Sequence, residues 1–387
     1  MNQSLEGLRV IDFTQIAAGP TCTMMLADRG ADVIKIEPPS GELGRQLGPP
    51  WIEGHSVIQL ALNRNKRGII LDLKDPADVE FAQSLIDDAD IVVESFRPGV
   101  MERLGLGYPA LKTRHPGLIY CSISAYGQAG ADCARPGVDG AIQAVSGLMS
   151  TTGFADGPPT KMQAPVIDMV TGFFATIAIL DALLLRSQGG AGKWLDVSMY
   201  SCAMQLQQTA LASYLTSRDL PERTGNAAPY SAPNEVYETA DGWLLVAAYH
   251  PARWKSFCVC LKMPHLTDDH RFATSPLRVA NRHELTTLIA PTLKQRTTQQ
   301  WVETLSSVDI ICSPVLDYQA ATRSEQFKRA GLSAQVMQPG IGEMRVVPPM
   351  TFEAASGSTP NVLRPAPTLG EHTDEIRATY TKRTAQI

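Results

Sequence analysis

The chain has 387 residues, which favours two domains over one, and 44% of them are hydrophobic, enough to form a large core. A formal net charge of −5 gives no electrostatic reason to expect nucleic acid as a partner. The seven cysteines are scattered and show no zinc-motif spacing, so we expect a cytoplasmic protein without a metal. The N-terminus has neither the apolar core of a signal peptide nor an Arg-rich transit pattern.

Strand and helix patterns alternate through the first half of the chain. The strands are expected at 8–13, 31–37, 68–73, 91–94 and 118–124, and helices at 20–29 and 76–87. Alternation of this kind predicts parallel pairing in a doubly wound, Rossmann-like α/β sheet. Such sheets bind their ligands at the carboxyl ends of the strands.

The pattern changes after Arg223. The segments 234–238 and 243–247 predict a hairpin, and helices are expected near 251–261, 281–293 and 298–305. We interpret 224–330 as a smaller α+β domain. Because the tail at 364–374 is expected to pack on the first domain, the small domain would be inserted into a large domain made of 1–223 and 331–387.

Asp168 is the only charged residue between Lys161 and Asp181. A carboxylate in apolar surroundings is poorly solvated and more nucleophilic when charged, which suits covalent catalysis on an acyl group. An aspartate before an apolar helical run is also a good N-cap, and the residue alone favours that role. The run is interrupted by Pro165 and is too short for a membrane span, so we expect a buried helix.

Two basic clusters stand near predicted strand ends, in the loop 63–68 and at Arg97 and Arg103. Either could hold a phosphorylated ligand such as a nucleotide or CoA, although a solvated turn explains the first equally well. Dinucleotide binding is disfavoured because the turn before Pro20 lacks the GxGxxG pattern, which leaves Glu37 without a phosphate loop. Neither a P-loop, a GxSxG elbow nor a histidine metal motif occurs.

A series of short motifs runs in order along nearly the whole chain. They are Val10–Thr14 with Ala18–Pro20, Asp32–Pro38, Asn63–Arg67 with Leu71–Lys74, Glu94–Gly99, Gly105–Gly107, Ser124–Gln128, Ser146–Met149, Thr152–Pro159, Asp168–Gly172, Gly189–Val197, Thr224–Asn226 and Arg364–His372. Together they resemble family III CoA-transferases, a superfamily that also includes 2-methylacyl-CoA racemases. Single motifs are weak, but the ordered set is specific.

The resemblance implies a CoA-transferase that moves CoA from an acyl-CoA donor to a carboxylic acid acceptor, with CoA as a substrate and no permanently bound cofactor. Asp168 matches the aspartate that forms a mixed anhydride with the acyl group and then a thioester with CoA. The family's fold implies an interlocked, ring-like homodimer. The resemblance places CoA along Gln15, Ile16, Ala17, Leu71, Lys74, Ser95, Phe96, Arg97, Arg103 and Tyr126.

The chain departs from the family pattern at three places. Pro38 and Pro39 replace a basic residue that follows the second strand in some members. Ala247–His250 stands where many transferases have a glycine-rich loop, and Ala227 replaces a histidine after Thr-Gly-Asn. These changes would alter the acceptor or the shielding of reactive anhydrides.

Two other functions remain to be weighed. A racemase needs a base on each face of the carbon beside the thioester, but Val138 stands where its histidine would be, which leaves Asp139 as a helix cap or a polar group of the pocket. A non-catalytic acyl-CoA-binding protein would bind CoA without exchange. For a transferase, a small dicarboxylate acceptor with a succinyl-CoA donor is one option, and Lys161, Gln163 and Tyr249 are candidate contacts to the acceptor carboxylate or ordinary surface and core residues.

Overall fold

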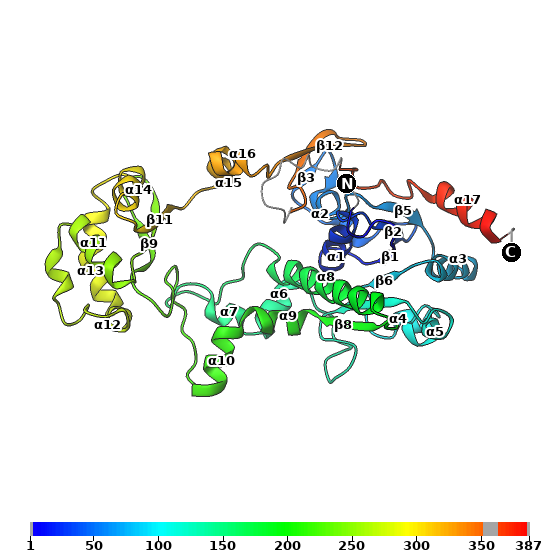
Figure 1. The fold of residues 1–387 in the computed structure, drawn as a ribbon, viewed down its shortest axis with the longest axis horizontal. Coiled ribbons are helices and arrows are strands. Elements are labelled where there is room, and N and C mark those ends of the chain that lie inside the picture. The colour runs from blue at the N-terminus through cyan, green and yellow to red at the C-terminus, as the bar shows by residue number, and fades with distance from the viewer. Residues whose placement is uncertain (1–2, 351–362, 385–387) are drawn as a thin grey trace. The chain divides into compact units, whose positions relative to one another are not determined.

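The structure is a computed structural model that describes residues 3–350 and 363–384 (Figure 1). The chain forms two compact units. The first consists of Met1–Leu148, Lys161–Asp219 and Gly331–Ile387, and the second of Met149–Thr160 and Leu220–Ala330.

A six-stranded sheet forms the centre of the first unit. Its order is β5-β2-β1-β6-β7-β8, and every neighbouring pair is parallel. The strands are mostly continuous apolar runs, as a sheet covered on both faces requires. They are β1 (Arg9–Phe13), β2 (Asp32–Glu37), β5 (Arg67–Ile70), β6 (Ile91–Glu94), β7 (Ile119–Ser124) and β8 (Trp194–Ser198). The predicted α/β class with a parallel sheet is confirmed, and β8 is a strand that the sequence pattern did not predict.

Helices cover both faces of this sheet (Figure 1). The main ones are α1 (Ala18–Ala27), α3 (Pro76–Asp87), α5 (Tyr108–Arg114), α8 (Val166–Ser187) and α17 (Thr373–Thr384). Val10 of β1 belongs to the apolar cluster that includes Ala175 of α8, whereas its neighbour Ile11 belongs to the cluster that includes Leu85 of α3. Successive side chains of β1 therefore point to opposite faces, as the period of a strand requires.

Shorter elements connect and extend this unit. They are η1 (Leu43–Gln46), β3 (Trp51–Ile52), β4 (His55–Ser56), α2 (Val57–Leu62), α4 (Val100–Arg103), α6 (Asp139–Val145), α9 (Met199–Leu206), α10 (Gln208–Ser217), β12 (Ala334–Gln338) and β13 (Gly342–Val346). Helix α7 (Leu148–Thr151) stands at the boundary, because the second unit begins at its second residue. β12 and β13 pair as an antiparallel hairpin.

Helices α1 and α8 touch at Gly172, one turn after Asp168. A Cβ atom at Gly172 would lie 2.7 Å from the Thr21 side chain and 2.8 Å from the Ala18 carbonyl oxygen. The Thr21 hydroxyl also lies 3.5 Å from the Met169 sulfur. The missing side chain thus lets the start of α8 approach the start of α1.

Gly172→Ala is expected to destabilise the protein by about 2 kcal/mol, even though alanine is the better helix former by about 1 kcal/mol. The new methyl group would overlap a β-branched side chain and backbone, neither of which can move away cheaply. Urea unfolding measures the loss. Gly140→Ala on α6 is the matched control, because the atoms nearest to its Cβ would be those at the flexible end of the Lys161 side chain, 3.1 to 3.5 Å away. Equal stabilities of the two variants would contradict this account of the helix contact.

Helix α8 is longer than the apolar run in the sequence predicts. It has 22 residues and is long and apolar enough to cross a membrane by length and composition, so the expectation of too short a run is wrong. In the most apolar 18-residue stretch of the helix, 39% is buried, and the helix packs against α1, α9, β7 and β8. The core helices of soluble proteins pass the same test, so this one helix is weak evidence for a membrane span.

The second unit has a three-stranded antiparallel sheet in the order β11-β10-β9. Helices pack on it around a core that includes Trp254, Phe257 and Trp301. Its elements are β9 (Asn234–Glu238), β10 (Trp243–Ala247), α11 (Pro251–Cys260), η2 (Pro264–Thr267), α12 (Ser275–Ala280), α13 (Arg282–Leu293), α14 (Thr298–Ser306), β11 (Ile311–Pro314), α15 (Tyr318–Arg323) and α16 (Glu325–Arg329). The predicted hairpin of β9 and β10 is confirmed.

The second unit also includes residues 149–160, which the sequence assigns to the large domain, and it begins at Leu220 where the sequence predicts a change at 224. Hydrogen bonds explain the difference. The Gly225 N–H donates to the Gly153 carbonyl at 2.9 Å, and Arg223 donates to the Phe154 and Gly157 carbonyls. These bonds tie the early segment to the start of the second unit. That the second unit is an inserted domain stays a prediction.

The C-terminal tail packs on the first unit, as predicted. The Arg364 N–H donates to the Asn65 side chain at 2.8 Å, and the His372 N–H donates to the Gly68 carbonyl at 2.9 Å. Between them, Pro367 accepts from Arg45 at 3.0 Å. Residues from both ends of the chain thus stabilise the same unit.

Candidate active site

The strand order reverses between β1 and β6, and this is where a parallel sheet of this kind opens a crevice at its carboxyl ends. Gln15–Ala17 follow β1, and Ser95–Arg97 follow β6. The Gln15 N–H donates to the Ser95 hydroxyl at 3.0 Å, which joins the two loops. Six of the ten predicted CoA-binding residues therefore meet at the switch point of the sheet.

The turn after β1 is held in a strained conformation. Ile16 has a φ of 65°, a left-handed geometry that is unfavourable for a β-branched residue. Its N–H donates to Glu42 Oε2 at 3.1 Å, and the same oxygen accepts from the Gly44 N–H at 2.6 Å. Glu42 is buried, and its other oxygen lies 3.9 Å from Lys35 Nζ and has no hydrogen bond to the part of the chain that the structure describes. One carboxylate oxygen of Glu42 thus links the turn at Ile16 to the start of η1.

A buried ionic network supports this turn. Lys35 Nζ donates to the Thr14 carbonyl at 2.8 Å, and Lys66 Nζ lies 3.0 Å from Asp12 Oδ2. Burial alone would raise the pKa of Asp12, but the ammonium groups of Lys66 and Lys35 outweigh it and lower that pKa to about 2. Burial is the main cause that lowers the pKa of Lys66 to about 8. Charges that are buried in this way need their partners.

The charged side chains of the basic loop 63–68 form internal ion pairs. Arg64 pairs with Asp28 and Arg67 with Asp32, in addition to the pair of Lys66 with Asp12. Both interpretations left open by the sequence, a phosphate grip and a solvated turn, are therefore wrong. The loop anchors β5 to β1, β2 and α1.

Other cations at the strand ends are exposed. Arg97, Arg103 and Lys74 have no side-chain ion pair or hydrogen bond among the residues that the structure describes. They lie after β6, at the end of α4 and after β5, respectively. Their guanidinium and ammonium groups are free to meet a phosphorylated ligand.

The loop after β6 rests on Glu94. Glu94 Oε2 accepts from the Phe96 N–H at 2.8 Å, and burial raises the pKa of Glu94 to about 7. Leu71 is buried directly after β5, and Tyr126 follows β7 with the Arg135 guanidinium 5.3 Å from its ring centre. All ten predicted CoA-binding residues thus lie on the loops or the short helix that follow strands β1, β5, β6 and β7.

The ion pair of Glu37 further disfavours a nicotinamide site, in which this carboxylate would have to bind a ribose. Arg45 donates to both of its carboxylate oxygens, at 2.6 and 2.7 Å. Burial raises the pKa of Glu37, but the hydrogen bonds from Arg45 and the charge of Lys35 outweigh it and lower that pKa. The carboxylate is therefore committed to an internal pair.

Asp168 lies in the first turn of α8 and does not cap it. The helix begins at Val166, with Pro165 as the residue before it. Asp139 supplies the cap, because its Oδ2 accepts from the Ile167 N–H at 2.8 Å and from the Asp168 N–H at 3.2 Å. The N-cap role favoured for Asp168 by its local sequence is wrong. Asp139 is a cap, as expected, but of α8 and not of its own helix α6.

The Asp168 carboxyl is half-buried, and its acidity is shifted accordingly. Burial is the main cause that raises the pKa of Asp168 to about 7, and the carboxylate of Asp139 adds to this, whereas Lys161 lowers it. A carboxyl group whose pKa lies near neutral pH is partly ionised there, and its carboxylate is poorly solvated, which suits it to nucleophilic attack.

The candidate acceptor contacts fall in different units. Lys161 and Gln163 are exposed just before α8 in the first unit. Tyr249 belongs to the second unit, where its carbonyl accepts from Arg278 at 2.9 Å and its side chain is exposed. After β10 the chain turns directly into α11, because His250 caps that helix, so Ala247–His250 forms no extended loop.

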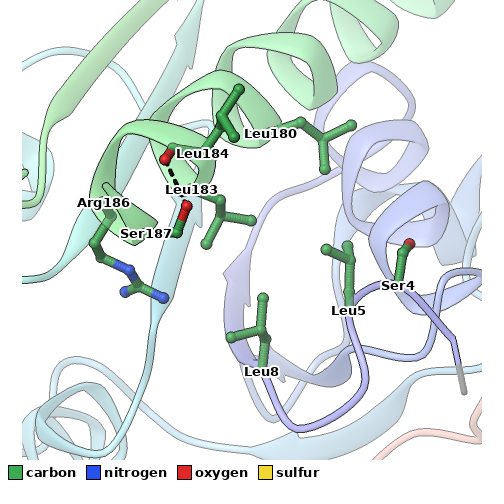
Figure 2. Close-up of a pocket in the computed structure, with 8 residues that line it drawn as sticks. All are labelled: Ser4, Leu5, Leu8, Leu180, Leu183, Leu184, Arg186 and Ser187. Atoms are coloured by element: carbon green, nitrogen blue, oxygen red, sulfur yellow. Dashed lines mark hydrogen bonds between the residues drawn. The ribbon is translucent and has the colours of Figure 1, made fainter. Parts of the chain in front are cut away.

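A cavity in the first unit lies away from this chemistry. It is lined by Ser4, Leu5, Leu8, Leu180, Leu183, Leu184, Arg186 and Ser187 (Figure 2). The lining residues from α8, Leu180 to Ser187, are at the end of the helix opposite to Asp168.

Within 3–350 and 363–384, no cluster of three or more histidine, cysteine, aspartate or glutamate side chains could hold a metal ion.

Comparison with known proteins identifies the class. Residues 5–373 match CoA-transferase family III. The chain is 34% identical to mouse succinyl-CoA:glutarate CoA-transferase over 373 residues, which covers 96% of this chain and 85% of that protein. It is 33% identical to the succinate--glutarate CoA-transferase of Agrobacterium fabrum over 382 residues, with 97% and 95% covered.

A solved structure agrees with this. A CaiB/BaiF family protein from Brucella suis superposes with a TM-score of 0.86 at 33% identity, and 98% of this chain and 100% of that one are covered. The chain therefore belongs to CoA-transferase family III. It is an enzyme that transfers CoA.

Proposed function

We propose that the enzyme moves CoA from an acyl-CoA donor to a carboxylic acid acceptor by covalent catalysis at Asp168. The observation that carries this proposal is the half-buried Asp168 carboxyl at the start of α8, with a pKa of about 7. Its helix is held against α1, which follows the turn at the switch point of the sheet.

The steps balance without any outside acid or base. The Asp168 carboxylate attacks the thioester carbonyl, the C–S bond breaks, and an aspartyl–acyl anhydride and CoA thiolate form. The thiolate attacks the aspartyl carbonyl, which releases the donor acid and leaves an aspartyl-CoA thioester. The acceptor carboxylate attacks that thioester and expels the thiolate, and the thiolate then takes the acceptor acyl group and frees Asp168. Each step exchanges one acyl bond for another, so a difficult exchange is divided into easier ones.

CoA is proposed to lie in the crevice between the loops after β1 and β6. Backbone groups of Gln15–Ala17 and the side chains of Ser95 and Tyr126 would face its pantetheine part, and the free cations Lys74, Arg97 and Arg103 would hold its phosphates. CoA is the substrate, and we propose no permanently bound cofactor.

A small dicarboxylate acceptor with a succinyl-CoA donor is our proposal for the substrates. The mouse and Agrobacterium relatives are named for succinate or succinyl-CoA and glutarate, and an Acetobacter aceti protein that is 35% identical over 340 residues is named acetyl-CoA:oxalate CoA-transferase. All of these names combine a CoA thioester or its acid with a dicarboxylic acid.

We also propose an interlocked homodimer in the cytoplasm. Phe173, Ile177 and Leu184 of α8 expose large apolar side chains, which single soluble chains tend to cover. All seven cysteines are free thiols, which suits a reduced compartment. Light scattering coupled to size-exclusion chromatography measures the mass, and a monomer at micromolar concentration would contradict the dimer.

Isotope exchange separates the three candidate functions. A transferase exchanges a labelled free acid into the acyl-CoA, a racemase takes up deuterium beside the thioester without exchange, and a binding protein does neither. We expect exchange without deuterium uptake. The racemase is disfavoured because Val138, 62% exposed before α6, carries no proton-transferring group.

Glu42→Gln is expected to raise KM for the CoA thioester about tenfold with a smaller effect on kcat, because one lost charge-assisted hydrogen bond costs about 1.5 kcal/mol. The new amide would present a donor to the Lys35 ammonium and loosen the turn at Ile16. Steady-state kinetics measures the change. Glu53→Gln, on an exposed turn, is the matched control. A folded Glu42 variant with unchanged KM would contradict the role of Glu42.

A further inference from the structure

Lys161 lies beside the acid pair that begins α8. Its side chain runs along the first turn of α6, because a Cβ atom built on Gly140 would lie 3.1 Å from Lys161 Cε and 3.5 Å from its Nζ. Gly140 directly follows Asp139, the residue whose carboxylate accepts from the Asp168 N–H. The stem of Lys161 is therefore in contact with the helix turn that positions Asp168.

The backbone next to Lys161 is fixed to the same group of residues. Gln143 is buried, and its side-chain amide accepts from the Met162 N–H at 2.9 Å and donates to the Met162 carbonyl at 3.3 Å. The same Gln143 nitrogen donates to Asp139 Oδ1 at 2.5 Å. One buried amide thus connects the segment that carries Lys161 to the acid that caps α8.

The ammonium group itself is unused. Lys161 is exposed and makes no ion pair or hydrogen bond with any described residue. Its charge nevertheless acts on Asp168. Lysine has a flexible stem and a compact charge, so the ammonium group can follow a small anion that is tethered at Asp168.

We propose that Lys161 binds the second carboxylate of a dicarboxylic acid while the first carboxylate reacts at Asp168. This inference rests on the proposed transferase function and assigns the residue that selects its acceptor. A dicarboxylate that forms an anhydride with Asp168 keeps one negative charge, and a charge-assisted hydrogen bond from the Lys161 ammonium group would stabilise it. A monocarboxylate of the same length has no group to offer Lys161.

The test compares Lys161→Met with the wild type on matched acceptors, the four- and five-carbon dicarboxylates against butyrate and valerate. In a ping-pong reaction kcat/KM for the acceptor is independent of the donor, so one donor serves for all. We expect kcat/KM for the dicarboxylates to fall at least about tenfold, the value of a hydrogen bond to a charged group, and the monocarboxylate values to stay within about twofold.

Two further variants complete the design. Lys161→Arg keeps the charge and is expected to keep the preference for dicarboxylates. Lys193→Met removes another exposed lysine, just before β8, and is expected to leave both acceptor classes unchanged.

Two results would overturn the inference and leave the transferase standing. One is an unchanged preference in Lys161→Met, and the other is an equal loss on both acceptor classes with a shifted pH profile, which would mean that Lys161 acts only through the charge of Asp168. Failure of the wild type to transfer CoA to any acid would instead overturn the proposed function, and this inference with it.

Discussion

Asp168→Asn is expected to reduce CoA transfer by at least about a thousandfold, because an amide cannot form the anhydride on which every later step depends. Asparagine matches aspartate in size, so the side chain should remain at the start of α8 and the CoA crevice should be undisturbed. Transfer is measured by liquid chromatography of the acyl-CoA products, and binding of CoA by calorimetry.

Asp181→Asn is the matched control for this variant. It removes a carboxylate from the same helix, at an exposed position more than three turns away. Activity of this control should equal that of the wild type. A folded Asp168→Asn enzyme that still exchanges CoA at the wild-type rate would make Asp168 an architectural residue.

The same substitution should change the pH dependence of stability. The pKa of Asp168 rises from 3.8 to about 7 on folding, so the folded state holds a proton that the unfolded state has lost between these values. Stability contributed by the neutral carboxyl is thus lost as pH rises through that range. We expect Asp168→Asn to exceed the wild type in unfolding free energy by on the order of 2–4 kcal/mol at pH 8, with the difference vanishing below pH 4.

The second large effect is expected in the pH profile of the reaction. Only the ionised Asp168 can attack, so kcat/KM should fall about tenfold for each pH unit below the pKa of about 7. At pH 5 the rate constant should therefore be about a hundredfold below its plateau. Initial rates in constant-ionic-strength buffers from pH 5 to pH 9 measure this fall in kcat/KM, the acid limb of the pH profile.

Asp139→Asn tests the cause of this limb. The substitution removes the repelling charge and leaves an oxygen that can still accept from the two N–H groups at the start of α8. The pKa of Asp168 should fall, and the acid limb should move to lower pH. Glu94 titrates in the same range, so Glu94→Gln is the control that should leave the limb in place. An unmoved limb in Asp139→Asn with a moved limb in Glu94→Gln would contradict the assignment.

Sequence patterns predicted the elements whose signals are local. Helix α3 begins and ends where the sequence indicates, because Asp75 and Pro76 mark its start. The hairpin of β9 and β10 follows its alternating pattern. Strand β8 was missed because a glycine-rich segment and Lys193 precede it, and its stabilising contacts, the pairing with β7 and the packing of Leu195 and Val197 in the core, are long-range.

The errors at the site come from partners that are distant in sequence. Asp168 has the local pattern of a cap, but Asp139, 29 residues away in the chain, performs that role. The cations of the basic loop have their acids on β1, β2 and the end of α1. Glu42 is the N-cap of the short helix η1, with no pattern that would mark it as a partner of Ile16, and only the fold brings its carboxylate to the Ile16 N–H.

The CoA-binding candidates came from the family resemblance, and their contact with CoA stays a prediction; only their place at the ends of the strands can be compared with the fold. Parallel strands carry their ligands at their carboxyl ends, so residues that follow β1 and β6 must lie near the switch point once the strand order is known. The hydrogen bond from the Gln15 N–H to the Ser95 hydroxyl agrees with this placement.

Chemical trapping at Asp168 tests the central claim most directly. The enzyme is mixed with an acyl-CoA donor in the absence of acceptor, quenched with hydroxylamine, digested and analysed by mass spectrometry. We predict an aspartyl hydroxamate at Asp168 that requires the donor and disappears in Asp168→Asn. An active enzyme whose Asp168 peptide remains unmodified, with the hydroxamate on another residue or on none, would contradict the account.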